Sequence, residues 1–276
     1  MNRLPELQQY LRTLAPDGIA LAFSGGVDSS FLLALLKELH QENPFPLFAL
    51  TMQTVFQSDE EIRETRELSR ESGVPLKLFS CDPLSLPEIR NNPPDRCYWC
   101  KRFIFNQFTV FCREHNIRNL LDGTNADDLH VYRPGRRALA ELGVISPLAE
   151  FGFTKAEIRK CAAERGLHCH AKPSMPCLAT RFEYGIRLTP ERIAQAGKGE
   201  ALLRKHVPEA ADVRLRVHGK MARIEVSPEA LAGVLEKRKQ IAAELHLLGF
   251  EFVTLDLEGY RSGCFDQGKT FTETEV

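Results

Sequence analysis

One short stretch, LAFSGGVDSS (residues 21–30), restricts the fold of this chain more than any other feature of the sequence. An apolar run ends in a serine and two glycines, and a helical pattern, FLLALLKELH, follows within a few residues. A strand that leads through such a turn into a helix is typical of a phosphate site, because the first N–H groups of a helix are unpaired and carry a partial positive charge. Gly25 and Gly26 have no Cβ, so phosphate oxygens can approach the backbone closely.

The polar residues of this stretch suit the same ligand. Ser24 and Ser29 offer hydroxyl donors, and Asp28 is expected to hold a Mg²⁺ that neutralises the phosphates. The alternative is an ordinary strand–helix turn with a polar cap. It would explain a bare Gly-Gly pair, but it explains the full Ser-Gly-Gly-x-Asp-Ser pattern less well.

Strand-like and helix-like runs alternate along the first half of the chain. The predicted strands cover residues 18–24, 45–53, 74–81 and 117–124, and the predicted helices cover 29–41, 58–73 and 98–116. This alternation predicts an α/β fold, a doubly wound parallel sheet with helices on both faces. A capping-box pattern at Thr154 and Glu157 then predicts the start of a further helix, which Gly166 ends.

The pattern changes after about residue 182. A helix is predicted over residues 188–207, followed by strands at 212–219 and 221–226, a helix at 228–249 and a strand at 250–259. We therefore expect two domains, residues 1–182 and a smaller α+β domain of residues 183–276.

Composition limits the class of protein. The net charge of −1 over 276 residues gives no global electrostatic support for a nucleic-acid or membrane surface. There is no apolar run of about 18 residues, and the N-terminus has an amphipathic helix pattern with no signal-peptide core, so a cytosolic location is expected. In that reducing compartment the eight cysteines are not expected to form a disulfide framework.

A second phosphate motif, GCFDQGKT (residues 263–270), matches the pattern G-x-x-x-x-G-K-[ST]. Only six residues follow it, which is too few for the helix that such a loop requires. We treat this match as coincidental.

The SGGVDSS stretch resembles the pyrophosphate loop of the PP-loop ATP pyrophosphatases, which have an adenine nucleotide alpha hydrolase-like fold and include GMP synthetase, NAD synthetase and tRNA thiolation enzymes. The resemblance implies that ATP is split between its α and β phosphates and that AMP is transferred to a substrate oxygen. In an open parallel sheet the ligand edge is formed by the carboxyl ends of the strands. Gly123, Thr124 and Asn125 follow a predicted strand at that edge and are expected to bind the nucleotide. Asp127 is expected near the metal. Arg133 is expected near the phosphates, although an arginine here could also belong to a solvated helix face.

Four further segments make the chain similar to the LarE family: residues 120–143, CLATRFEYG (177–185), VRLRVHGKMARIEV (213–226) and FVTLDLEGYRSG (252–263). LarE proteins are ATP-dependent sulfur transferases that act in synthesis of the nickel-pincer nucleotide cofactor of lactate racemase. The resemblance implies that a carboxylate of a pyridinium dicarboxylate mononucleotide is adenylated and then converted to a thiocarboxylate. It also implies a homo-oligomer.

Strand alternation suits an anionic substrate. Arg214 and Arg216 fall on one face of the strand at 212–219 and apolar residues on the other, and Glu225 shares a face with Arg223. An arginine-rich face can bind anions bidentately, although the exposed face of a half-buried sheet has the same pattern. The family resemblance favours substrate binding, and it adds to this set Arg181, Glu200, Asp256 and Arg261.

The source of the sulfur is the remaining question. Some LarE proteins sacrifice one cysteine, whereas others resemble thiolation enzymes in which three cysteines hold a [4Fe–4S] cluster. Cys97, Cys100 and Cys177 match the three-cysteine pattern, which leaves one iron open to exogenous sulfide. Two alternatives stay open: a structural zinc site that adds residues of the run His168–His170, and a metal-free Cys177 that donates sulfur directly. The other cysteines are expected to pack in the interior: Cys81, Cys112, Cys161 and Cys264.

Two other functions remain open from sequence. A tRNA thiolation enzyme would need a basic, RNA-sized surface or an added module, and neither is visible. A non-catalytic adenine-nucleotide-binding protein would keep the glycine turn but would have no use for the three cysteines together.

Overall fold

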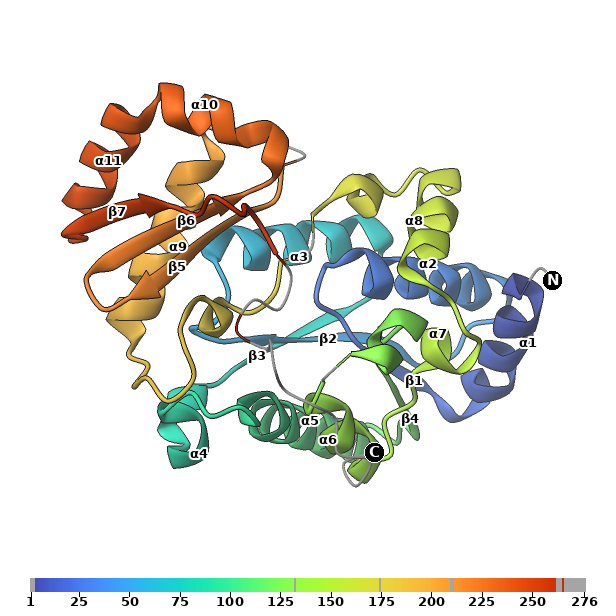
Figure 1. Cartoon of the computed structure of the whole chain (residues 1–276). Coiled ribbons are helices and arrows are strands. Elements are labelled where there is room, and N and C mark those ends of the chain that lie inside the picture. Colours follow the sequence, from blue (N-terminus) through green and yellow to red (C-terminus); the bar gives the residue numbers. More distant parts are fainter. Residues whose placement is uncertain (1–2, 132, 174, 209–210, 262–264, 266–276) are drawn as a thin grey trace.

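The computed structural model describes residues 3–131, 133–173, 175–208, 211–261 and 265. Its helices and strands gather around two β-sheets (Figure 1). The larger group consists of α1 (Leu4–Leu14), β1 (Ile19–Ala22), α2 (Val27–Glu42), β2 (Leu47–Gln53), α3 (Asp59–Ser72), β3 (Leu76–Ser80), α4 (Pro87–Arg90), α5 (Arg96–Glu114), β4 (Asn119–Leu121), α6 (Gly135–Glu141), α7 (Pro147–Glu150) and α8 (Lys155–Glu164). The smaller group consists of α9 (Pro190–Arg204), β5 (Val213–His218), β6 (Met221–Val226), α10 (Leu231–Glu236), α11 (Arg238–Leu247) and β7 (Phe252–Leu255).

The larger sheet confirms the predicted α/β fold. Its four parallel strands have the order β3-β2-β1-β4. Helices α2, α3 and α8 cover one face and α4, α5 and α6 the other (Figure 1). The chain moves to one side of β1 through β2 and β3 and then crosses to the other side for β4. Such a change of direction opens a crevice at the carboxyl ends of β1 and β4, where ligands of open α/β sheets bind.

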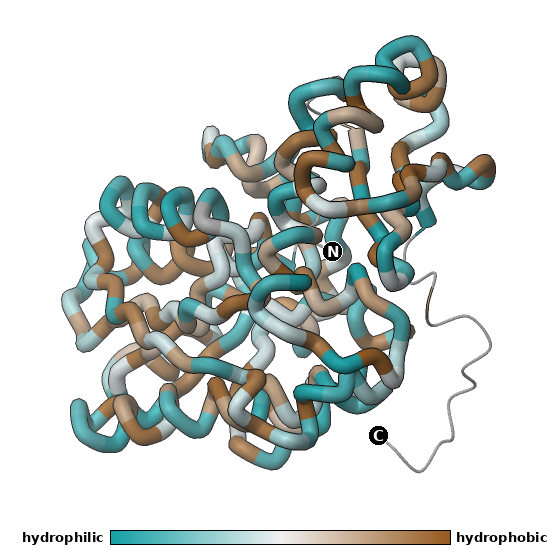
Figure 2. Tube along the Cα trace, turned by 90° about the vertical axis from the view of Figure 1, so that its left-hand side faces the viewer, coloured by the Kyte–Doolittle hydropathy of each residue, from teal (hydrophilic) through white to brown (hydrophobic). Residues whose placement is uncertain are grey.

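Each face of this sheet has its own apolar core. Leu32 and Leu35 of α2 pack with β1 on one side, and Phe105 and Phe108 of α5 pack on the other. Hydrophobic and hydrophilic residues alternate along the helices, as expected for helices that bury one face (Figure 2). The sheet that carries the glycine turn is therefore held rigidly from both faces.

The predicted helix boundaries in this group are confirmed where capping residues mark them. Ser58 and Glu61 form a capping box at the start of α3, and Gly73 ends the helix with a φ of 74°. Thr154 and Glu157 form a second capping box, which fixes Lys155 as the first residue of α8.

The smaller sheet has the expected β-β-α-β arrangement. Strand β5 pairs antiparallel with β6, and β6 pairs parallel with β7. The single helix predicted over residues 228–249 is instead divided at Lys237 into α10 and α11. Lys237 has a φ of −89° and a ψ of 8°, outside the helical region, and its N–H still donates to the Gly233 carbonyl. The domain boundary at residue 182 stays a prediction.

No helix in the described part of the chain is both long and apolar enough to cross a bilayer.

Candidate active site

The glycine loop, residues Ser24–Ser29, is held in place by its own hydrogen bonds. The Ser29 hydroxyl lies 3.1 Å from the Ser24 hydroxyl and donates to the Gly26 carbonyl, and the Gly26 N–H donates to Ser24 Oγ. Helix α2 begins directly after Gly26 without a side-chain cap. Its first N–H groups are therefore available to an anion at the end of β1.

Gly25 is required on two counts. Its φ of 72° lies in the left-handed region, which side chains with a Cβ rarely adopt. A Cβ built at Gly25 would also lie 2.7 Å from Thr65 Oγ1, and Thr65 is buried in α3. Helix α3 therefore supports the loop from behind, at a distance that only glycine allows.

Gly123 brings the end of β4 against the same loop. A Cβ at this position would lie 3.0 Å from the Ser29 nitrogen and 3.3 Å from Asp28 Cβ. The residues after Gly123 organise the turn: Thr124 donates to the buried Asp122, and Asn125 caps a short helix (Ala126–His130) by accepting from the Asp127 and Asp128 N–H groups. The predicted meeting of the ends of β1 and β4 is present in the structure.

A cavity of about 310 Å³ opens in front of the glycine loop. Its lining includes the loop residues Ser24, Gly25, Gly26 and Asp28 together with Cys177. Four predicted phosphate-binding residues and one predicted sulfur-handling cysteine thus border a single space, whereas Ser29, Gly123, Thr124, Asn125 and Asp127 are not part of its lining. Because adenylation of a carboxylate and attack of sulfur would involve the same carboxyl group, this juxtaposition suits a two-step reaction.

Three cations that line this cavity were missed by the sequence analysis: Lys155, Arg159 and Lys172. Lys155 Nζ lies 2.5 Å from Asp28 Oδ2. The backbone N–H of Lys155 donates to Asp127 Oδ2 at 2.8 Å. Arg159 donates to the carbonyls of His170 and Lys172. The capping box at Thr154 was a signal for the start of α8, but no pattern in the sequence showed that this end of α8 faces the glycine loop.

Asp28 has the environment of a metal ligand. Burial raises the pKa of Asp28 above its ordinary value, and the nearby Lys155 acts in the opposite direction. Asp28 Oδ1 is buried and has no hydrogen-bond partner among the described residues, whereas Oδ2 contacts Lys155. A buried carboxylate oxygen without a donor fits a hard cation such as Mg²⁺.

The three cysteines come together from two distant segments. Cys97 and Cys100 lie in the first turn of α5, on neighbouring positions of one helix face, and Cys177 precedes a short helix, Leu178–Arg181. Cys100 and Cys177 both pack against the apolar cluster of the smaller sheet, and Arg96 contacts Cys97 Sγ. Burial raises the pKa of the Cys100 thiol, and Cys177 and Cys97 raise it further. Burial likewise raises the pKa of Cys177, while Arg96 opposes that shift.

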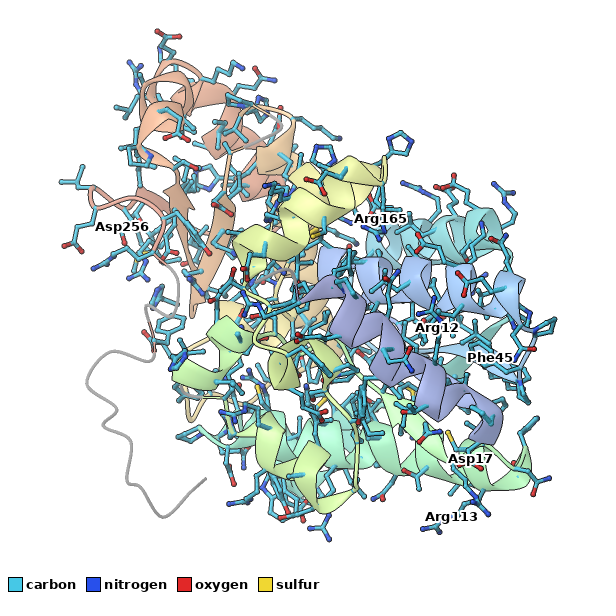
Figure 3. The ribbon with its side chains drawn as sticks, turned by 90° about the vertical axis from the view of Figure 1, so that its right-hand side faces the viewer. Arg12, Asp17, Phe45, Arg113, Arg165 and Asp256 are labelled. Carbon is cyan, nitrogen blue, oxygen red and sulfur yellow. The ribbon has the colours of Figure 1, made fainter. Side chains whose placement is uncertain are left out.

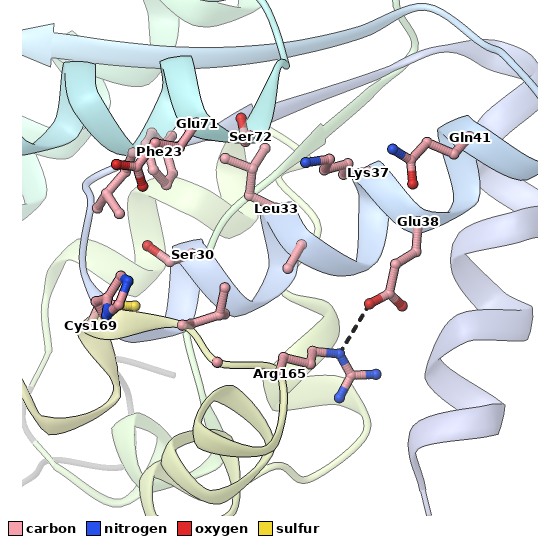
Figure 4. A pocket seen from close by; sticks show the side chains of 15 residues that line it. Phe23, Ser30, Leu33, Lys37, Glu38, Gln41, Glu71, Ser72, Arg165 and Cys169 are labelled. Atoms are coloured by element: carbon pink, nitrogen blue, oxygen red, sulfur yellow. Dashed lines mark hydrogen bonds and ion pairs between the residues drawn. The ribbon is translucent and has the colours of Figure 1, made fainter.

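The residues of the zinc alternative lie elsewhere. His168 and Cys169 line a second cavity of about 430 Å³, between α2, α3 and the end of α8, next to Ser30 and the Arg165–Glu38 ion pair (Figure 4). Within the described ranges, no three His, Cys, Asp or Glu side chains are arranged to hold one metal ion. Of the cysteines expected to pack, Cys112 is buried, Cys81 and Cys161 are partly buried, and Cys264 lies outside the described residues, as does the motif at 263–270 apart from Phe265.

The arginine-rich face of the smaller sheet is buried and internally paired. Arg216 Nε donates to Glu225 Oε2 at 2.9 Å, and Arg223 donates to Glu225 Oε1 at 2.8 Å. Asp256 follows β7 and lies 3.6 Å from Arg223 Nε and 3.8 Å from Arg261. In Figure 3 it lies in the smaller group of elements, far from Arg12 and Asp17 of the larger group. His218 Nε2 and Arg261 Nε are buried without a partner in the described part of the chain, which fits a site that awaits a polar ligand.

Arg181 and Arg214 flank the outer edge of this sheet. Arg181 binds both carboxylate oxygens of Glu200, and Glu200 also accepts the N–H of Leu215 in β5. Burial lowers the pKa of Arg214, and the positive charge of Arg181 lowers it further.

Arg133, which the sequence placed near phosphates, is an exposed residue paired with Asp128 and does not line the cavity.

A single turn connects the sheet face to the cysteines. The Thr180 carbonyl accepts from Arg216, and the Thr180 hydroxyl donates to the Cys177 carbonyl at 2.8 Å. The candidate substrate face and the cavity in front of the glycine loop are therefore joined through residues 177–181.

Comparisons with known proteins agree with this site. The model of the PP-loop domain matches residues 2–130. The chain is 34% identical over 259 residues to pyridinium-3,5-bisthiocarboxylic acid mononucleotide synthase of Lactiplantibacillus plantarum, which covers 94% of this chain and 91% of that protein. It is also 32% identical to an uncharacterized protein of Synechocystis sp., covering 95% of this chain and 96% of the relative, and 32% identical to one of Methanocaldococcus jannaschii, covering 88% and 91%.

Proposed function

This chain belongs to the LarE family of the PP-loop superfamily, and from that premise we propose that it is an ATP-dependent sulfur transferase acting on a pyridinium dicarboxylate mononucleotide. The observation that carries the proposal is the single cavity lined by the glycine loop and Cys177. A nucleotide bound at the loop would present its α-phosphate to the same space that the sulfur must enter.

In the first step a carboxylate oxygen of the substrate attacks the α-phosphorus of ATP, and the bond to the oxygen that bridges to the β-phosphorus breaks. The pyrophosphate leaves with that electron pair. We expect its charge to be stabilised by the N–H groups at the start of α2, by the Ser24 and Ser29 hydroxyls and by Lys155, since α2 begins without a side-chain cap and both Ser24 and Lys155 line the cavity. Asp28 would hold the Mg²⁺ that neutralises the phosphates.

In the second step a sulfur nucleophile attacks the carbonyl carbon of the acyl-adenylate, and AMP leaves with its oxygen to give the thiocarboxylate. The arginine face would orient the phosphate and second carboxylate of the substrate, since Arg214 and Arg216 offer the fork of donors that suits such anions. Glu225 holds the guanidinium group of Arg216 in a fixed position, and Glu200 does the same for the neighbouring Arg181.

We further propose that Cys97, Cys100 and Cys177 hold a [4Fe–4S] cluster. Each ligand of such a cluster binds a different iron, so three cysteines need not converge on one ion, and the fourth iron stays open to a sulfide. A persulfide or sacrificial Cys177 is the alternative donor for the same reaction. A cytosolic location and a homo-oligomeric state stay predictions.

The reaction is tested with ATP, Mg²⁺, sulfide and pyridinium-3,5-dicarboxylate mononucleotide. We expect substrate-dependent release of AMP and pyrophosphate and a thiocarboxylate product by mass spectrometry. Release of ADP, or cleavage of ATP that does not depend on the substrate, would exclude the proposal. Low-salt filter binding of tRNA tests the tRNA thiolation alternative.

The sulfur source is tested on anaerobically prepared protein. We expect the protein to contain iron and labile sulfide and to show a broad visible absorption band. The Cys97→Ala variant should lose this band, and the Cys112→Ala control should keep it. A colourless protein in which Cys177 becomes dehydroalanine after one turnover would identify the sacrificial donor instead.

A further inference from the structure

Arg96 is a buried guanidinium that lacks the usual partner. The residue is 3% exposed, at the start of α5, between the cysteine segments. Its hydrogen bonds go to Asn92 Oδ1, the Ala179 carbonyl and, at 3.6 Å, Cys97 Sγ. Among the described residues no carboxylate forms an ion pair with it.

A buried charge without a counter-charge is strongly destabilising, so charges in protein interiors are normally paired. The other cations near the cysteines follow that rule. Arg181 pairs with Glu200 and Lys101 pairs with Asp122. The groups around Arg96 that can carry negative charge are the thiols of Cys97 and Cys177 and the phenol of Tyr184, and Cys97 Sγ accepts a hydrogen bond from it.

We propose that Arg96 is a positioning residue that serves as the built-in counter-ion of the sulfur centre. This inference rests on the proposal that the three cysteines handle the sulfur, but it holds for cluster-bound and cysteine-bound sulfur alike, because thiolates and persulfides are both anionic. Arg96 compensates that negative charge and keeps Cys97 facing Cys177.

The competing explanation is purely structural. Asn92 Nδ2 donates to the carbonyls of Phe182 and Glu183, so Arg96 and Asn92 together fasten the start of α5 to the chain that follows Cys177. Glutamine at position 96 would keep hydrogen-bond donors but lose the charge, whereas lysine would keep the charge but lose the planar geometry. These two variants separate the explanations.

The experiment measures alkylation of each cysteine by neutral iodoacetamide and by anionic iodoacetate in reduced, metal-free protein, resolved by mass spectrometry. Both reagents react with the thiolate, so the ratio of their rates at one site does not depend on the fraction of thiolate and reports the charge beside the sulfur. We expect Arg96→Gln to lower the iodoacetate-to-iodoacetamide ratio at Cys97 and Cys177 about fivefold, as for loss of one neighbouring unit charge, and Arg96→Lys to stay within about twofold of the unsubstituted protein. Arg102→Gln, on the same helix, is the control and should leave both ratios unchanged.

Equal iodoacetate-to-iodoacetamide ratios in Arg96→Gln and the unsubstituted protein would overturn the proposal, as would an Arg96→Lys variant with a ratio as low as that of Arg96→Gln. If Arg96→Gln does not fold, the unsubstituted protein supplies the test. The ratio of alkylation rates for anionic iodoacetate over neutral iodoacetamide should be higher at Cys97 and Cys177 than at Cys161, and equal ratios would contradict a counter-ion. Because the protein contains no metal, the result does not depend on which sulfur donor the enzyme uses.

Discussion

Lys155 Nζ lies 2.5 Å from Asp28 Oδ2, so the first turn of α8 and the first turn of α2 share an ion pair at the mouth of the glycine loop. Both residues line the cavity. The contact gives Asp28 a counter-charge while its other oxygen stays open, and it fixes a cation opposite the backbone of Gly25 and Gly26.

The first prediction concerns this cation. Lys155→Met removes a positive charge from the phosphate cavity, so we expect the KM for ATP to rise about tenfold, a loss of about 1.4 kcal/mol of binding free energy. Lys160→Met, an exposed position on the same helix, is the matched control. Steady-state pyrophosphate release measures both, and an unchanged KM in Lys155→Met would show that Lys155 does not contact the nucleotide.

The second prediction compares two glycines with the same backbone conformation. Gly25 and Gly73 have φ values of 72° and 74°, but a Cβ at Gly73 meets nothing within 4 Å. Alanine at Gly73 should lower the free energy of unfolding by about 1–2 kcal/mol, and alanine at Gly25 should lower it further because of the overlap with Thr65. Only Gly25→Ala should also abolish pyrophosphate release, because Thr65 blocks the added Cβ. Full activity in folded Gly25→Ala protein would be incompatible with a phosphate-binding loop.

The third prediction concerns pH. Hydrogen bonds from the Thr154 N–H and hydroxyl lower the pKa of Glu157 below its ordinary value, and Arg3 lowers it further. A carboxylate with a lowered pKa in the folded state stabilises the protein above its ordinary pKa, and that contribution is lost as the pH falls through the folded-state value.

Glu157→Gln should therefore lower the free energy of unfolding by about 0.5–1 kcal/mol at neutral pH, a cap-sized effect on a largely exposed group. The difference from the unsubstituted protein should shrink as the pH falls below the ordinary glutamate range. Urea denaturation across that range measures it, with Glu114→Gln as an exposed control. A difference that grows towards acid pH would mean that this carboxylate is not stabilised in the folded state.

The fourth prediction contrasts a buried and an exposed ion pair. Glu200→Ala leaves Arg181 buried without its partner and removes the acceptor for the Leu215 N–H, so we expect a loss of about 3–5 kcal/mol in unfolding free energy. Glu251→Ala breaks an exposed pair with Lys220 and should cost less than about 1 kcal/mol. Equal losses in urea denaturation would argue against a tightly packed arginine face.

Local patterns predicted the parts of the fold that local physics determines. The capping box at Thr154, the helix predicted over residues 58–73 and the glycine turn after β1 lie where the sequence placed them, because each depends on neighbouring residues. The division of the helix at Lys237 was missed, since a single internal glycine is a weak signal. Strand alternation also placed Arg214 and Arg216 on one face correctly, but it could not show that Glu225 would bury and pair with Arg216.

The cations of the cavity were beyond reach of the sequence for a different reason. Lys155 and Lys172 become relevant only because α8 and the segment after it fold back over α2, and that contact is set by tertiary packing. A lysine on an amphipathic helix is far more often a solvated side chain than a ligand. Arg96 was overlooked similarly, because burial of an arginine cannot be read from its neighbours in sequence.

The proposed sulfur centre draws on two remote segments, which has a consequence for biogenesis. Cys97 and Cys100 emerge from the ribosome well before Cys177, which precedes the turn at Leu178–Arg181. On the proposed assignment, a factor that delivers iron to all three thiols would act on a chain that has already closed this long-range contact. Loading of the centre would then double as a checkpoint for completed folding.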